Sequence, residues 1–450
     1  MDRGPGIEAQ GDQPPALRDS LILLSVLAPL AGLGAGVIGA LFRQALEQAN
    51  RVRETLASGL AAWGAGGFVL FVALAAAAAA AAAWLVRRVE PSAAGSGIPR
   101  VLAVLDETVA PAPARVIPVK FVAGTLAIGS GLALGREGPT VQMGGSFAYQ
   151  AGKLLRRSWA DCRALLAAGA GAGFAVAFNA PIAGALFVFE VLVKRFDARM
   201  AVAALAACGV ATWVGRAISG NAAEFTVAPL TEPGLLALPS FVLLGIAAGF
   251  AGMVYNRTLL ATLQACERLP GLSAEVRAGA IGAAVGALAW FAPSLVGGGD
   301  GLAQQALSGE GTLVLLPLLF LLRLGLIAVS VAAGTPGGLL VPFLALGAEL
   351  GLWVGLLCTL AFPGLALDTH GFAVVGMAAL FTAIVRAPLT AIVLICEMTA
   401  SATMWLSLTM ACCTAMLVPT LFGEASILDA LKTRLLGPRQ TPGGGALPAP

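Results

Sequence analysis

The chain has 450 residues, of which 58% are hydrophobic and only 11% are charged, and its mean hydropathy is +0.89. Water would not keep such a chain in solution, so we expect it to lie in a lipid bilayer. The formal net charge of +3 is too small for a nucleic-acid-binding protein, and no basic run is interleaved with aromatic residues.

The chain begins with residues 1–19, which are rich in proline, glycine and charge and lack the features of a cleaved signal peptide. We interpret this segment as a flexible tail. Long apolar stretches follow, covering most or all of the ~20 residues that a membrane-spanning helix needs, and several others are shorter. The long stretches are 21–41, 68–86, 241–254, 313–331 and 406–421. The sequence therefore predicts an all-α integral membrane protein.

The two halves of the chain resemble each other. Residues 180–190 (APIAGALFVFE) match residues 387–397 (APLTAIVLICE), with proline and glutamate at the same offsets. A Gly-rich interruption precedes each of them, at 135–145 and at 334–347. Repeated membrane halves broken by glycine and proline are typical of transporters whose interrupted helices meet near the bilayer midplane.

We therefore divide the chain into a first transmembrane repeat at 20–220 and a second at 221–436. Residues 437–450 form a short Gly/Pro-rich tail that we expect to be disordered. Arg87 and Arg88 follow the second long apolar stretch. Because cytoplasmic loops carry an excess of basic residues, we place these two arginines on the cytoplasmic side. We expect both termini to be cytoplasmic.

Three segments put glycine or proline directly before a short apolar stretch: 95–99 (GSGIP), 135–139 (GREGP) and 334–342 (GTPGGLLVP). Each is a helix start, where unpaired backbone N–H groups and the positive end of the helix dipole point outward. Such starts, converging within a membrane, would bind an anion without a full positive charge in lipid, and weakly enough to release it. A fourth candidate is the C-terminal segment 426–436.

Two side chains in these segments are candidates for chemistry. Ser96 offers a hydroxyl donor to an anion, and the alternative is an ordinary N-cap serine. Glu137 is harder to explain as structure, since a carboxylate in an apolar segment costs about 2.5–3.5 kcal/mol. Either it pairs with the neighbouring Arg136, or its carboxylate lies against helix N-termini where an anion would bind, so that protonation opens the path.

The motifs GSGIP, GREGP and GGLLVP, in this order, resemble those of the CLC family of chloride channels and chloride/proton antiporters, over residues 20–436. The resemblance implies an inverted-repeat helical fold and a homodimer with one chloride pore per subunit, in the inner membrane of a bacterium. It also implies that Ser96 coordinates chloride and that Glu137 is the gating glutamate. The other implied chloride donors are the backbone N–H groups of Gly138, Leu339, Leu340 and Val341.

The chain also departs from the family pattern. Val191 stands where proton-coupled members carry an inner glutamate, and an apolar side chain cannot relay a proton. The pore-lining tyrosine of the last family helix falls near Leu428, so one hydroxyl donor is missing, and Leu340 replaces the phenylalanine of GxFxP. We therefore expect chloride movement of the voltage-gated channel type or with weak proton coupling. The alternative is an obligate chloride/proton antiporter, in which water or another carboxylate replaces the relay.

The remaining residues point away from catalysis. His370 is the single histidine, and neither an HExxH motif nor a GxxxxGK[ST] loop is present, which argues against a zinc hydrolase and an ATP-driven pump. We expect no enzyme, no cofactor and no metal, and we interpret the seven scattered cysteines as small core residues. Glu190 and Glu397, which end the two matching stretches, are interpreted as caps or ion-pair partners. The rival from another class is a cation-coupled transporter of an organic solute.

Overall fold

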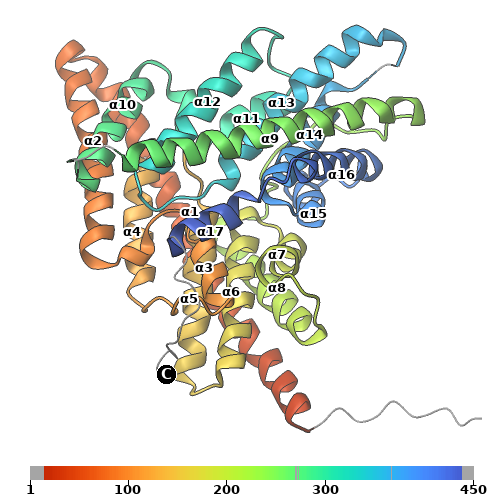
Figure 1. The fold of residues 1–450 in the computed structure, drawn as a ribbon. Coiled ribbons are helices and arrows are strands. Elements are labelled where there is room, and N and C mark those ends of the chain that lie inside the picture. Colours follow the sequence, from red (N-terminus) through yellow and green to blue (C-terminus); the bar gives the residue numbers. More distant parts are fainter. Residues whose placement is uncertain (1–14, 269–270, 272, 366, 438–450) are drawn as a thin grey trace, which may run out of the picture.

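The computed structural model describes residues 15–268, 271, 273–365 and 367–437, and this part of the chain folds into helices without a β-strand (Figure 1). The all-helical fold class predicted from the sequence is therefore confirmed. Most of the two predicted tails, 1–19 and 437–450, lies outside the described residues.

Each half of the chain contributes a series of helices. The first half contains α1 (Pro15–Ala61), α2 (Gly64–Val89), α3 (Ile98–Leu105), α4 (Val116–Gly129), α5 (Glu137–Leu154), α6 (Trp159–Phe178), α7 (Pro181–Phe187) and α8 (Ala198–Ser219). The second half contains α9 (Leu238–Glu267), α10 (Ala274–Phe291), α11 (Asp300–Leu307), α12 (Leu315–Ala332), α13 (Leu340–Ala361), α14 (Thr369–Val385), α15 (Pro388–Thr399), α16 (Trp405–Leu421) and α17 (Ile427–Leu436). Short helical turns join them: η1 (Pro91–Ala93), η2 (Val188–Val193), η3 (Leu235–Ala237), η4 (Pro293–Leu295) and η5 (Pro363–Leu365).

Helix length separates two groups of elements. Among the described residues, eight helices are long and apolar enough to cross a membrane, namely α1, α2, α6, α8, α9, α10, α12 and α13. Shorter apolar helices, including α4, α7, α14, α15 and α16, lie among them. Figure 1 shows α3 and α17, which contact each other, where the two halves of the molecule meet. Short helices that end inside the protein leave their polar ends to be satisfied by other protein groups or by a ligand.

The repeat seen in the sequence is visible as reciprocal capping between α7 and α15. The Glu190 carboxylate, in η2, accepts hydrogen bonds from the backbone N–H groups of Leu389 and Thr390 at 3.0 and 2.7 Å. The Glu397 carboxylate, in α15, accepts the matching pair from α7, at 3.1 and 2.8 Å. Each glutamate thus satisfies the first turn of the helix in the other half. The interpretation of these two glutamates as caps is confirmed.

Glycine allows the helix pairs of both halves to pack closely. A Cβ atom on Gly144 of α5 would lie 2.5 Å from the carbonyl oxygen of Gly169 in α6. In the second half, a Cβ atom on Gly347 of α13 would lie 2.7 Å from the carbonyl oxygen of Gly376 in α14. Small residues at helix crossings are the usual means of close packing in membranes. These crossings position α5 and α13, whose first turns form the candidate site.

Candidate functional site

The three Gly-containing segments meet through their backbones. Gly337 N–H donates to the carbonyl oxygen of Gly95 at 3.3 Å. Gly135 and Gly338 exchange two backbone hydrogen bonds, at 2.9 and 2.6 Å, in a single antiparallel bridge. The starts of α3, α5 and α13 therefore converge, as predicted from the sequence, although the segments come from both halves of the chain.

Glu137 lies at the centre of this convergence. It is the first residue of α5 and is fully buried, and its Oε1 accepts a hydrogen bond from Leu340 N–H at 2.5 Å. A Cβ atom on Gly135 or on Gly338 would clash with the Glu137 carboxylate. Its Oε2 has no hydrogen-bond partner among the described residues. The carboxylate thus fills a space between two glycines, against the positive end of α13, where an anion is stabilised.

Ser96 borders the same space. Its side chain is buried, and its hydroxyl has no hydrogen-bond partner in the described part of the chain. A Cβ atom on Gly138 would clash with the Ser96 hydroxyl and would lie 3.1 Å from Gly338 Cα, so these three residues are neighbours. The N-cap of α3 is Gly97, in a left-handed conformation with φ of 90°, and no side chain caps the helix. The alternative role of Ser96 as an N-cap is therefore wrong, and its hydroxyl is available to a ligand.

The other predicted site residues are buried at the starts of α13 and α17 and in η2. Leu339 is the N-cap of α13, Val341 lies in its first turn, and both side chains are buried. Leu428 is buried in the first turn of α17, which packs against α3. Val191 is buried in η2.

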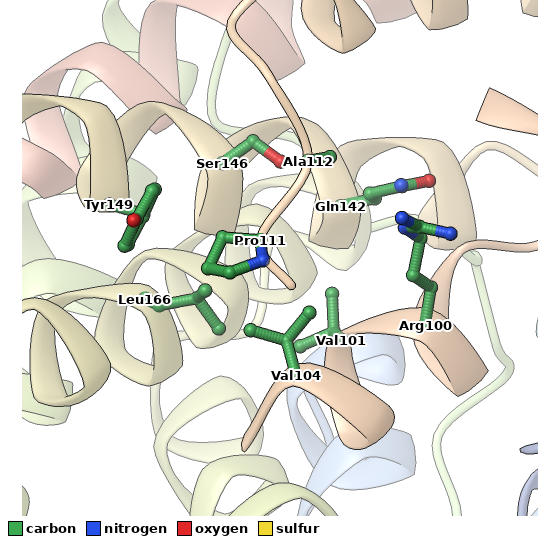
Figure 2. A pocket seen from close by; sticks show the side chains of 9 residues that line it. All are labelled: Arg100, Val101, Val104, Pro111, Ala112, Gln142, Ser146, Tyr149 and Leu166. Carbon is green, nitrogen blue, oxygen red and sulfur yellow. The ribbon is translucent and has the colours of Figure 1, made fainter. Parts of the chain in front are cut away.

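A cavity of about 310 Å³ leads to Ser96 from the side of α17. Its lining includes Ser96, Leu339, Glu267, Leu431 and Arg434. A second cavity, of about 20 Å³, lies between α3, α5 and α6 and has room for about one water molecule (Figure 2). Of these two cavities, the larger one borders the starts of both α3 and α13.

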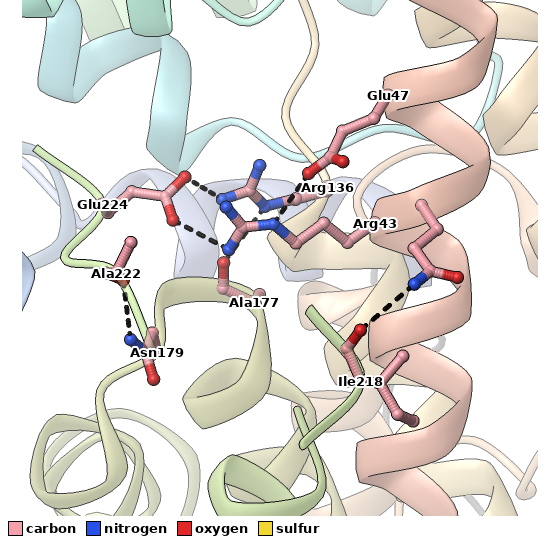
Figure 3. A network of polar contacts seen from close by, with 9 residues as sticks. Arg43, Glu47, Arg136, Ala177, Asn179, Ile218, Ala222 and Glu224 are labelled. Carbon is pink, nitrogen blue, oxygen red and sulfur yellow. Dashed lines mark hydrogen bonds and ion pairs between the residues drawn. The ribbon is translucent and has the colours of Figure 1, made fainter. Parts of the chain in front are cut away.

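Arg136 does not pair with Glu137. Its guanidinium forms an ion pair with Glu224 and donates to the carbonyl oxygen of Ala177 at 3.1 Å (Figure 3). The second oxygen of Glu224 accepts from Arg43 of α1 at 3.0 Å. The interpretation of Glu137 as the salt-bridge partner of Arg136 is therefore wrong. Sequence reasoning missed Glu224, because nothing local distinguishes a carboxylate in the irregular segment between α8 and α9.

This pair supports a prediction about stability. Replacing Glu224 by glutamine leaves a buried guanidinium without its carboxylate, and we expect the free energy of unfolding to fall by about 3 kcal/mol. Burial alone would raise the pKa of Glu224, but Arg136 and Arg43 hold it below its ordinary value. The stabilisation is therefore present above the ordinary glutamate pKa of about 4.3 and is lost as the pH falls through the lower folded-state pKa.

Chemical denaturation in detergent micelles at neutral and acidic pH checks this prediction. Glu232→Gln, an exposed position in the same segment, is the matched control and should leave stability unchanged. An equal effect of both substitutions, or a Glu224→Gln effect that persists at acidic pH, would contradict the assigned role of the pair.

Further buried charges were missed in the sequence, three of them within the apolar helices α4, α12 and α13. Lys120 donates to the carbonyl oxygen of Gly95 at 2.9 Å and to Gln142 Oε1 at 2.5 Å, which ties the first motif to α4 and α5. Arg323, fully buried in α12, donates to three backbone carbonyl oxygens between residues 295 and 298. Glu349 is buried in α13. A charge within a long apolar stretch is the signal that could have identified them.

The comparison with known families decides the identity of this fold. The family model described as voltage-gated chloride channel matches residues 77–420. The chain belongs to the CLC family. A relative from Cronobacter sakazakii, named H(+)/Cl(-) exchange transporter ClcA, is 36% identical over 93% of this chain and 91% of its own length. A relative of the same name from Vibrio parahaemolyticus is 35% identical over 91% of this chain and 89% of its own length.

Solved CLC structures share the fold. A slow cyanobacterial Cl⁻/H⁺ antiporter matches with a TM-score of 0.88 and 32% identity, covering 93% of this chain and 99% of its own. A CLC-type fluoride/proton antiporter matches with a TM-score of 0.77 and 22% identity, over 91% of this chain and 97% of its own. The second likeness concerns the fold alone. The CLC-type architecture predicted from the motifs is confirmed.

Proposed function

We propose that this CLC protein exchanges chloride for protons across a bacterial inner membrane, with Glu137 acting as the gate and proton carrier. The observation that carries the proposal is the position of the Glu137 carboxylate, which accepts the Leu340 N–H bond at the start of α13. A site that binds one carboxylate at a helix start offers the same donors to a halide ion. The names of the relatives, which are exchange transporters, support the substrates.

The geometry supports a site that two anions, the Glu137 carboxylate and chloride, occupy in turn. When Glu137 is ionised, its carboxylate occupies the donors of α13 and excludes chloride. Protonation removes its charge, so chloride competes successfully for the Leu339, Leu340 and Val341 amides, for Gly138 N–H and for the Ser96 hydroxyl. The ionised carboxylate and chloride therefore occupy the same donors in turn, so the binding of chloride is coupled to the protonation of Glu137.

The sequence favoured channel-like movement because Val191 cannot relay a proton. We place exchange first, since the relatives are named exchangers and the fold offers another proton route. The cavity of about 310 Å³ reaches Ser96 and can hold a chain of water molecules. Such a chain would carry protons toward Glu137 without a side chain at position 191, although weaker coupling follows if chloride uses the same cavity.

We also propose the homodimer that the family resemblance implies, with both termini cytoplasmic. The supporting observation is the exposure of apolar side chains on helices too short to span a membrane. Ile182 at the start of α7 is 53% exposed, and Leu389 at the start of α15 is 60% exposed. A second copy of the chain would cover these helices and their polar ends.

Purified protein in liposomes tests the exchange directly. We expect chloride efflux, and a reversal potential that shifts when a pH gradient is imposed at constant chloride. A reversal potential set by chloride alone would overturn exchange and restore the channel-like alternative. Uptake of a labelled amino acid or sugar that the unlabelled compound inhibits, in the absence of chloride movement, would instead support the cation-coupled transporter of an organic solute.

A further inference from the structure

A buried phenol in α9 has no role in the site as described so far. Tyr255 is fully buried, and its hydroxyl has no hydrogen-bond partner among the described residues. Buried hydroxyl groups normally have a partner, and leaving one unpaired is costly. A phenylalanine would pack equally well, so the hydroxyl indicates an acceptor that is not one of these protein groups.

The side of α9 that carries Tyr255 leads toward the anion site. Tyr255, Leu259, Leu263 and Glu267 follow one another at four-residue spacing, so each side chain is a neighbour of the next along α9. Leu263 and Glu267 line the cavity that reaches Ser96. Tyr255 lies two turns further along the same side, beyond the buried Leu259.

The ring of Tyr255 adjoins the helix start that binds Glu137. It packs edge-to-face on Phe343, with ring centroids 5.8 Å apart and an interplanar angle of 86°. Phe343 lies one turn after Leu340, whose amide donates to Glu137. The ring that carries the unpaired hydroxyl is therefore packed on the beginning of α13, the helix whose start would bind carboxylate and chloride in turn.

We propose that the Tyr255 hydroxyl donates a hydrogen bond to the chloride that replaces the Glu137 carboxylate. This assignment rests on the proposed chloride transport and adds a side-chain donor to Ser96. At the start of α17, Leu428 is apolar and the Ser426 hydroxyl is already paired with Asp429, so α9 supplies the donor that α17 lacks. A Tyr hydroxyl bound to a halide is a charge-assisted hydrogen bond.

Tyr255→Phe tests the proposal, because it removes one oxygen atom and leaves the ring packing unchanged. The chain has two tyrosines, and Tyr149 provides the matched control, since it lines the separate small cavity (Figure 2). Its ring contacts that of Trp159. Calorimetric titration of the purified protein with chloride, in isethionate buffer, should show about tenfold weaker binding for Tyr255→Phe. Tyr149→Phe should bind chloride as the unchanged protein does.

A spectroscopic measurement on the unsubstituted sequence makes the test independent of the stability of the variants. Incorporation of 3-fluorotyrosine gives two ¹⁹F resonances, and the control variant Tyr149→Phe is sufficient to assign both of them. Chloride should shift the Tyr255 resonance and leave the Tyr149 resonance in place. A static Tyr255 resonance, or unchanged affinity in Tyr255→Phe, would overturn the proposal if the protein itself binds and transports chloride. Absence of chloride binding and flux in the unchanged protein would overturn the proposed function, and this assignment with it.

Discussion

Glu137→Gln should abolish proton coupling while chloride flux continues. The glutamine side chain has nearly the size of the protonated carboxyl group but cannot ionise, so it can neither carry a proton nor compete as an anion for the α13 amides. We expect chloride to occupy the site at every pH. The reversal potential should then follow the chloride gradient alone, and the pH dependence of chloride flux should disappear.

The measurement uses liposomes with opposed chloride and proton gradients, recording both ions. Glu107→Gln is the matched control, because Glu107 is an exposed glutamate whose partners, Arg163 and Trp159, lie outside the site. The control should retain the coupling of the unchanged protein. Retention of the full pH response in Glu137→Gln would show that another group is the gate.

Gly138→Ala should nearly eliminate chloride transport. The added methyl group would clash with the Ser96 hydroxyl and would lie 2.5 Å from the Ser96 carbonyl oxygen, which belongs to the backbone and cannot rotate away. Ser96 and the Gly138 amide must therefore move apart, and both are proposed chloride donors. Because misplacement of binding groups by about 1 Å can cost a factor of about 100 in rate, we expect a loss of flux of that order.

Gly325→Ala is the control for this substitution. A Cβ atom on Gly325, in α12, would meet no other atom within 4 Å, so the change adds only helix propensity. Chloride efflux from liposomes compares the variants at equal protein content, and thermal unfolding in detergent establishes that both are folded. Normal flux in a folded Gly138→Ala protein would show that chloride does not pass between Ser96 and the start of α5.

Much of the fold was predictable because its causes are local. Apolar stretches near bilayer length indicated four of the eight candidate spanning helices in the described residues, α1, α2, α9 and α12, whereas the stretch 406–421 forms the shorter α16. Glycine before Pro99, Pro139 and Pro342 indicated the interrupted helices. The shared offset of proline and glutamate in 180–190 and 387–397 indicated the duplication that appears as reciprocal capping. The short helix α11 was less accessible, since a few apolar residues have no distinctive period.

The sequence by itself determined that helix starts with exposed amides would be present, and that Glu137 would be costly unless those amides served it. Only the tertiary structure decided the partners. Glu137 meets the Leu340 amide across 203 residues, Arg136 meets Glu224 across 88, and the hydroxyl of Tyr255 is left unpaired beside Phe343. The reason is physical, because composition and periodicity report what a segment buries, whereas hydrogen-bond partners depend on which distant segments the packing of the helices brings together.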